Sequence, residues 1–201
     1  MLTRFFDFVS ALLLLIVTAP VMLIAAVLIR LDSKGPILFK QTRVGYRGRT
    51  FTVYKFRTLV HSDDHATPNG LEPVPRVDDF KTFVFNPFGG GRPTTRVGKY
   101  LRLTSLDELP NLLNVLKGEM RLVGPRPEVP ELVVQYPSEY HRRHEVKPGM
   151  TGLAQVSGRG DLTYHETMLY DLEYVRSHSL RCDLSILART LPALLSRKGA
   201  R

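Results

Sequence analysis

The chain has 201 residues, of which 43% are hydrophobic and 23% are charged. This length fits one domain, and this composition excludes an intrinsically disordered chain. Cys182 is the only cysteine, so an internal disulfide and a cysteine-rich zinc site are excluded as well.

The formal net charge of +9 is concentrated in one segment. Residues 30–57 contain eight basic side chains and a single acidic one, Asp32. A basic segment this short indicates a defined anionic partner, such as phosphate, nucleic acid or lipid head groups.

Residues 8–29 form an uninterrupted run of 22 residues without a charged side chain. As a straight helix this run is about 33 Å long, which suffices to cross a hydrocarbon layer of about 30 Å. A buried core helix normally keeps a polar stripe, and a cleaved signal peptide has a shorter apolar region. We therefore predict a membrane-inserted helix over residues 1–31.

Pro20 lies near the middle of this run, where it removes one helical hydrogen bond and predicts a kink. Two geometries follow: a kinked helix that spans the membrane, and a re-entrant helix that returns to the side it entered. The positive-inside rule fits both, since basic residues stand at both ends and the later ones outnumber Arg4. In either geometry we expect residues 32–201 on the cytoplasmic side.

The rest of the chain predicts a small domain with many helices and short strands. Alternation with period two predicts a strand over residues 51–56 after a hairpin at 43–49, and residues 61–95 are expected to be irregular. The apolar residues 184–195 fit either a core helix or a helix in the membrane interface. The remaining predicted elements are helices at 97–117, 131–144 and 164–177 and a short strand at 152–156.

The strongest candidate for chemistry is the segment SLDELPN, from Ser105 to Asn111. Ser105 and Glu108 have the spacing of a capping box, but Pro110 would then lose a helical hydrogen bond. If Asp107 is the N-cap instead, Pro110 lies in the first turn, where no donor is needed. Both carboxylates then lie at a helix N-terminus, which also favours phosphate. A simple capping role for Asp107 is the alternative.

Two glycine- and proline-braced loops present arginines: Arg126 in GPRPE and Arg159 in GRG. Each fits a phosphate ligand and, taken alone, equally well a rigid turn with a solvated arginine. Lys55 and Arg57 flank Phe56 on the predicted strand, so both lie on the face opposite Phe56. Together these residues predict an anion pocket with two carboxylates. Carboxylates beside a polyphosphate need a divalent cation, most readily Mg²⁺, to bridge them.

Four segments, taken in order, resemble the bacterial sugar transferases, which are small monotopic phosphoglycosyl transferases acting on polyprenyl phosphate. The segments are KFRT at 55–58, SLDELPNLLNVLKG at 105–118, LVGPRPE at 122–128 and KPGMTG at 147–152. The resemblance extends to about Asp183. It implies an α+β, helix-rich cytoplasmic domain anchored by a re-entrant N-terminal helix broken at Pro20. Ala19 stands where the family commonly has serine, which leaves Thr18 to satisfy the carbonyl that the proline frees.

The resemblance also implies a reaction. The family transfers sugar-1-phosphate from a UDP-sugar to undecaprenyl or another polyprenyl phosphate and releases UMP, through a phosphosugar held covalently on an aspartate. Asp107 then corresponds to the nucleophile and Mg²⁺ ligand, and Glu108 to its catalytic partner. The implied substrate- and phosphate-binding residues are Lys55, Arg57, Arg102, Arg126, Glu128, Arg159 and Asp171.

The implied setting is the bacterial inner membrane, where such an enzyme begins the assembly of a surface glycan. The implied partners are the UDP-sugar, the polyprenyl phosphate and membrane lipids, and we expect a homodimer. No recognition helix or aromatic platform points to nucleic acid. The competing hypothesis is a non-catalytic, membrane-anchored protein that binds polyprenyl phosphate or another polyanion. The paired carboxylates disfavour it, because they repel an anion.

Overall fold

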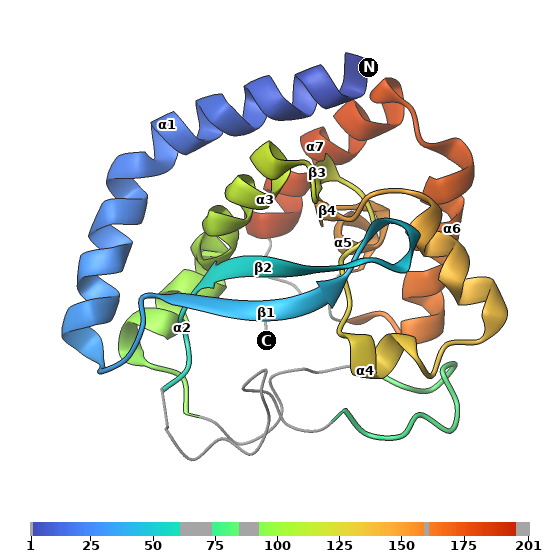
Figure 1. Cartoon of the computed structure of the whole chain (residues 1–201), viewed down its shortest axis with the longest axis horizontal. Coiled ribbons are helices and arrows are strands. Elements are labelled where there is room, and N and C mark those ends of the chain that lie inside the picture. Colours follow the sequence, from blue (N-terminus) through green and yellow to red (C-terminus); the bar gives the residue numbers. More distant parts are fainter. Residues whose placement is uncertain (1, 61–73, 85–92, 159–160, 196–201) are drawn as a thin grey trace.

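The structure, a computed structural model, describes residues 2–60, 74–84, 93–158 and 161–195 (Figure 1). Arg159 and most of the segment predicted to be irregular at 61–95 lie outside these ranges. Many helices and two small two-stranded sheets confirm the predicted helix-rich α+β class.

Helix α1 (Leu2–Asp32) arches over the domain, presents one narrow face to it and leaves the rest uncovered (Figure 1). Ala11 in its first half and Ala25 in its second half are buried. Large apolar side chains on the other faces are exposed, among them Leu13 at 58% and Val17 at 72%. The helix is long and apolar enough to cross a membrane, and its exposed apolar faces fit a helix that lipid covers.

Pro20 lies inside α1, where its ring leaves the Ile16 carbonyl without a helical donor. The Thr18 hydroxyl donates to the Leu14 carbonyl (2.6 Å). The expectation that Thr18 satisfies the freed carbonyl is therefore wrong. A hydroxyl inside a helix reaches back three or four residues, and the freed carbonyl lies only two residues before Thr18.

Strands β1 (Leu38–Val44) and β2 (Thr50–Phe56) form an antiparallel hairpin, which confirms the strand predicted at 51–56. A short 3₁₀ helix, η1 (Tyr46–Gly48), connects them. β2 contacts the segment that carries the candidate carboxylates. The hairpin therefore forms one wall of the candidate site.

The single helix predicted over 97–117 is wrong. Helix α2 (Arg96–Thr104) ends at Ser105, whose φ of 56° lies in the left-handed region. A 3₁₀ helix, η2 (Leu106–Asn111), then leads into α3 (Leu112–Lys117). The reason is Pro110, which has no N–H for an α-helix, so the chain turns at Ser105 and passes the proline in a 3₁₀ helix.

The second half of the domain is built around a parallel pair of short strands, β3 (Arg121–Val123) and β4 (Gly149–Thr151). Helix α5 (Leu153–Ser157) follows β4 and occupies most of the segment predicted as a strand at 152–156, so that prediction is wrong. A segment of five residues is too short for its pattern of apolar and polar residues to distinguish a strand from one turn of helix.

The helix predicted at 131–144 is also wrong. Helix α4 (Pro130–Val133) is a single turn, and a 3₁₀ helix, η3 (Ser138–Glu145), begins only after Pro137. Pro137 cannot donate to an α-helix that runs through it, so the segment divides there.

The last two helices are α6 (Tyr164–Ser177), which has its predicted bounds, and α7 (Leu180–Leu195), which contains the apolar tail. Ile186 of α7 is buried in the core, whereas Leu184 and Leu191 are exposed. α7 is therefore a core helix on one side with an uncovered apolar side opposite.

Three hydrophobic clusters hold these elements together, of which the smallest packs the second half of α1 against β2 and α2. The main core joins both ends of the chain and includes Ala11, Val53, Val115, Leu122 and Ile186. The second consists largely of aromatic rings and includes Phe80, Tyr136, Tyr140 and Tyr164. Phe80 belongs to the described piece 74–84, which thereby packs against η3 and the start of α6.

Candidate active site

The two candidate carboxylates, Asp107 and Glu108, lie on η2 directly after the turn at Ser105. Neither expected capping arrangement forms. Ser105 makes no side-chain capping bond, and Asp107 is the second residue of η2 and not the residue before it. The carboxylates therefore project from a short turn between α2 and α3.

Glu108 is held by two cations that come from distant parts of the chain. Its Oε1 accepts hydrogen bonds from Lys55 Nζ (2.7 Å) on β2 and from Arg126 Nη2 (2.8 Å) in the loop after β3. These three side chains line a small pocket, together with Asn111, which lies one turn further along η2. The sequence therefore predicted correctly that Lys55 and Arg126 meet the carboxylates.

The environment separates the pKa values of the two carboxyls. Burial, followed by the charge of Glu108, raises the pKa of Asp107 to about 6. Burial also opposes ionisation of Glu108, but Arg126 and Lys55 outweigh it and hold the pKa of Glu108 well below its usual range. Arg102 on α2 lies close enough for its charge to act on Asp107.

This separation gives the two carboxylates different chemical capacities. Glu108 stays ionised and fixed between two cations. Asp107 is ionised at neutral pH yet more basic than an ordinary aspartate, and basicity favours nucleophilic attack. The pair therefore fits one carboxylate that reacts and one that orders the surrounding cations.

Arg57 does not join this cluster. Its guanidinium donates to the Ser33 carbonyl (2.8 Å) and to the Pro36 carbonyl (2.6 Å), next to the end of α1. β2 ends at Phe56, so the alternation that would place Arg57 beside Lys55 stops there. Arg57 therefore fastens the junction of α1 and β1, contrary to its predicted role in the site.

Glu128 and Asp171 also differ from the predicted phosphate ligands. Glu128 is paired with Arg43 (3.4 Å), and Asp171 with Arg143 (2.6 Å), and all four side chains are buried. Each carboxylate thus balances a buried arginine, and their implied role in binding substrate stays a prediction. Arg159, the remaining predicted ligand, lies outside the described residues.

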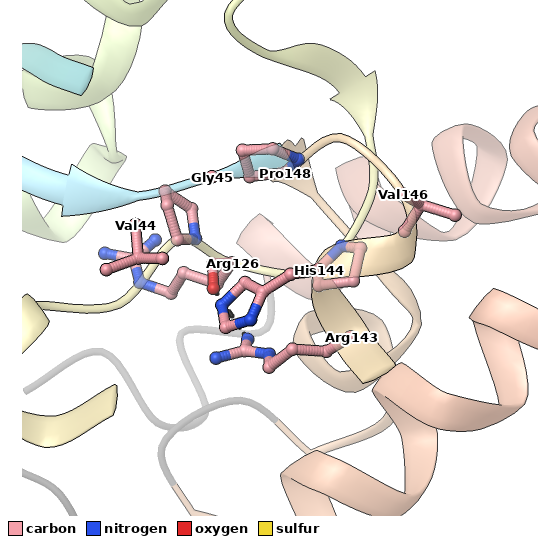
Figure 2. A pocket seen from close by; sticks show the side chains of 9 residues that line it. Val44, Gly45, Arg126, Arg143, His144, Val146 and Pro148 are labelled. Atoms are coloured by element: carbon pink, nitrogen blue, oxygen red, sulfur yellow. Dashed lines mark hydrogen bonds between the residues drawn. The ribbon is translucent and has the colours of Figure 1, made fainter. Parts of the chain in front are cut away.

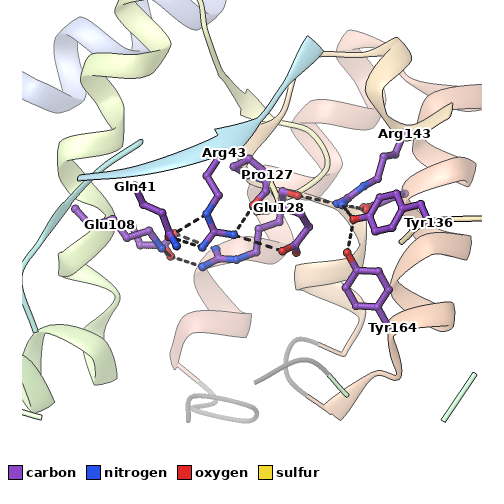
Figure 3. Close-up of polar contacts among 11 residues, drawn as sticks. Gln41, Arg43, Glu108, Pro127, Glu128, Tyr136, Arg143 and Tyr164 are labelled. Carbon is purple, nitrogen blue, oxygen red and sulfur yellow. Dashed lines mark hydrogen bonds and ion pairs between the residues drawn. The ribbon is translucent and has the colours of Figure 1, made fainter. Parts of the chain in front are cut away.

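Arg43 and Arg143, for which the sequence predicted no site role, both bind the loop that carries Arg126 (Figure 3). Arg43 also donates to Gln41 Oε1 (2.7 Å). Gln41 and Arg43 stand two apart on β1, so strand alternation was a usable signal for them. Arg143 stands in the run HRRHE, which contains no comparable signal.

A small pocket lies behind the Arg126 loop, lined by Arg126, Arg143 and His144 among others (Figure 2). His144 is buried and stacks on Tyr136. Its Nε2 has no hydrogen-bond partner among the residues that the structure describes. Burial, followed by the charge of Arg143, lowers the pKa of His144 to about 4.

We expect His144 to make the protein less stable in mild acid. Between pH 6.5 and about 4 the unfolded chain binds a proton at this histidine and the folded chain does not, so stability falls as the pH falls. His144→Phe keeps an aromatic ring stacked on Tyr136 and should remove about 2 kcal/mol of the unfolding free energy that is lost between pH 7 and pH 4.5. This figure is smaller than the full pKa shift would give, because solvent screens part of the charge. Unfolding free energies of both proteins at pH 7 and pH 4.5 measure this difference. An identical pH dependence in both would contradict it.

The chain is similar in sequence to known proteins over nearly its whole length. The family described as "Bacterial sugar transferase" matches residues 1–197. The "UDP-glucose:undecaprenyl-phosphate glucose-1-phosphate transferase" of Caulobacter vibrioides is 42% identical over 98% of this chain and 71% of its own length. The "Uncharacterized sugar transferase EpsL" of Bacillus subtilis is 38% identical over 98% of this chain and 89% of its own.

Other relatives are much longer than the matched region. The "Undecaprenyl-phosphate glucose phosphotransferase" of Komagataeibacter xylinus is 40% identical over 98% of this chain, but the match covers only 36% of that protein. The chain thus spans about a third of this relative and most of the Bacillus one.

Proposed function

Because this chain belongs to the bacterial sugar transferase family, we propose that it transfers sugar-1-phosphate from a UDP-sugar to undecaprenyl phosphate and releases UMP. The observation that carries the proposal is that the two adjacent carboxylates have different environments. Glu108 is held by Lys55 and Arg126, whereas Asp107 beside it has a raised pKa. The names of the relatives favour a hexose, with UDP-glucose and UDP-galactose as the first donors to try. The reaction would begin the assembly of a surface glycan.

In the first step, Asp107 attacks the phosphorus that carries the sugar. A bond forms between a carboxylate oxygen and this phosphorus, and the bond to the bridging oxygen breaks, so UMP leaves with that oxygen. In the second step an oxygen of the lipid phosphate attacks the same phosphorus and Asp107 leaves as a carboxylate. Lys55, Arg102 and Arg126 supply positive charge around the phosphoryl group in both steps.

The residues present fit a magnesium ion that the substrate shares. Among the residues described, no cluster of three or more His, Cys, Asp or Glu side chains could hold a metal by itself. Both oxygens of Glu108 already accept hydrogen bonds, Oε1 from Lys55 and Arg126 and Oε2 from Arg126, which leaves Asp107 as the available carboxylate. Mg²⁺ commonly binds through one or two carboxylates together with substrate phosphates and water. When bound there, it would neutralise charge on the diphosphate.

We also propose that α1 is re-entrant, with a kink at Pro20, and that the domain faces the cytoplasm. Both ends of α1 bind the same domain: Arg4 donates to the Leu116 carbonyl (2.8 Å), and Asp32 accepts from Val97 N (2.9 Å). A helix that crosses the hydrocarbon places its ends about 30 Å apart on opposite sides. One small domain cannot bind both ends of such a helix. The homodimer stays a prediction of the resemblance.

Thiol labelling tests this topology. In a Cys182→Ser background we expect Phe5→Cys and Lys34→Cys to react with a membrane-impermeant maleimide from the cytoplasmic side only. Val17→Cys, in the apolar middle of the helix, should not react from either side. Labelling of Phe5→Cys from the opposite side to Lys34→Cys would establish a spanning helix instead.

The reaction is tested by UMP release from a panel of UDP-sugars, with undecaprenyl phosphate and Mg²⁺ in detergent. Release with one donor would establish the reaction and identify the sugar. Tight binding of polyprenyl phosphate without release from any donor would favour the non-catalytic binding protein.

A further inference from the structure

The loop that carries Arg126 is bound at four consecutive backbone carbonyls. The donors are Gly149 N to Pro125 O (2.9 Å), Arg143 Nη2 to Arg126 O (2.7 Å), Arg43 Nη1 to Pro127 O (3.0 Å) and Val44 N to Glu128 O (2.8 Å). These donors come from different parts of the chain. Two of the four are arginine side chains, so substitution can remove them without changing the backbone.

Carbonyl bonds are the main means of fixing this loop. Pro125 and Pro127 have no N–H to donate, and each has a φ fixed by its ring. Pro127 also restricts Arg126 to extended conformations. Within this extended range the Arg126 carbonyl can still tilt, and the bond from Arg143 fixes its direction.

Close packing from the opposite side leaves the loop little room to move. A Cβ on Gly124 would lie 2.5 Å from the Lys147 carbonyl oxygen, and a Cβ on Gly149 would lie 2.1 Å from the Gly124 nitrogen. Only glycine at both positions allows this approach. The loop is thus held between β4 on one side and the two arginines on the other.

Arg143 is itself held by groups that are not part of the site. One nitrogen, Nη2, donates both to the Arg126 carbonyl and to Asp171 Oδ2 (2.6 Å) on α6, and Nη1 donates to the Tyr136 hydroxyl (2.9 Å). The side chains of Arg143 and Asp171 are each 2% exposed. Figure 3 shows Arg143 and Tyr136 on the other side of Glu128 from Glu108.

A buried ion pair is weak support for stability, because desolvation of both charges offsets most of their attraction. The pair nevertheless fixes a direction, since the carboxylate on α6 sets where the guanidinium points. Arg143 binds the backbone carbonyl of Arg126, and the guanidinium of Arg126 donates to Glu108 Oε1 at 2.8 Å. The contacts therefore run without interruption from Asp171 through Arg143 and Arg126 to the carboxylate pair.

We propose that Arg143, oriented by Asp171, is a positioning residue for Arg126 in the transfer reaction. By holding the Arg126 carbonyl, Arg143 keeps the Arg126 guanidinium between Glu108 and the substrate phosphate. This inference rests on the proposed function. It assigns to Asp171 a role behind the loop, where the resemblance implied only a general substrate- or phosphate-binding role.

The test is a double-mutant cycle on UMP release with radiolabelled donor. Arg143→Lys keeps the charge but replaces two terminal nitrogens, of which one binds Tyr136 and the other binds Asp171 and the Arg126 carbonyl, by a single one, and should lower kcat/KM about 10- to 100-fold. In an Arg126→Ala background, Arg143→Lys should have no further effect, because Arg126 is the group it positions. Arg142→Lys, the exposed neighbour on η3, is the matched control and should change kcat/KM less than threefold in either background.

Asp171→Asn provides a second variant if Arg143→Lys folds poorly, and should show the same dependence on Arg126. The thermal midpoint of each variant is measured so that comparisons are made at temperatures where all are folded. An equal loss in both backgrounds would show a merely structural role and overturn the inference, as would full activity of folded Arg143→Lys. Silence of the wild-type protein with every donor would instead count against the proposed function.

Discussion

Asp107→Asn is expected to abolish UMP release, lowering it by about 10⁴-fold or more, while the protein stays folded. The amide has the shape of the carboxylate but cannot attack phosphorus. The fold should survive, because burial raises the pKa of Asp107 to about 6 and its charged form is therefore disfavoured in the folded protein. A neutral side chain removes that penalty at pH 7, so the thermal midpoint should be unchanged or higher.

Glu108→Gln is the matched comparison for this prediction. It leaves Lys55 and Arg126 facing an uncharged amide, so we expect it to lower both activity and stability. Mass spectrometry of intact protein with donor and without lipid acceptor separates the two roles. Glu108→Gln should still accumulate a phosphosugar slowly, whereas Asp107→Asn should show none. UMP release by Asp107→Asn within tenfold of wild type would refute Asp107 as the nucleophile.

The parts of this site that sequence could predict are those encoded locally. Asp107 and Glu108 are adjacent, and Lys55 and Arg126 stand in short segments with clear turn or strand patterns. The contact of Lys55 and Arg126 with Glu108 was predictable because carboxylates and cations were expected to share one anion pocket. The same local reasoning failed for Arg57, because alternation shows which face a side chain takes only while the strand continues.

The remainder depends on pairs that are distant in the chain. Arg143 meets Asp171 across 28 residues, and Arg43 meets Glu128 across 85 residues. No local pattern shows that a charged side chain is buried against a particular partner, so the sequence did not indicate the arginine partners of Asp171 and Glu128. The helix boundaries failed for a related reason: Ser105 reverses the chain in a conformation that its residue type does not signal.

A second large effect is expected at Arg121, whose guanidinium links three elements. It donates to Asp7 Oδ2 on α1 (2.7 Å) and to Asp183 Oδ2 on α7 (2.7 Å), and both carboxylates are almost fully buried. Tyr174 Oη also donates to Asp183 (2.7 Å). This cluster joins the first turns of α1 to β3 and to α7.

Arg121→Leu should lower the free energy of unfolding by about 3–5 kcal/mol, because it leaves two buried carboxylates without a cation. Arg142→Leu is the matched control: its ion pair with Glu145 is half exposed, and its loss should cost about 0–1 kcal/mol. Denaturant unfolding in detergent measures both. Since the cost arises from the uncompensated charges, adding Asp7→Asn and Asp183→Asn to Arg121→Leu should restore part of the stability. A triple variant no more stable than Arg121→Leu alone would mean that packing of the Arg121 side chain, and not its charge, couples α1 to the domain.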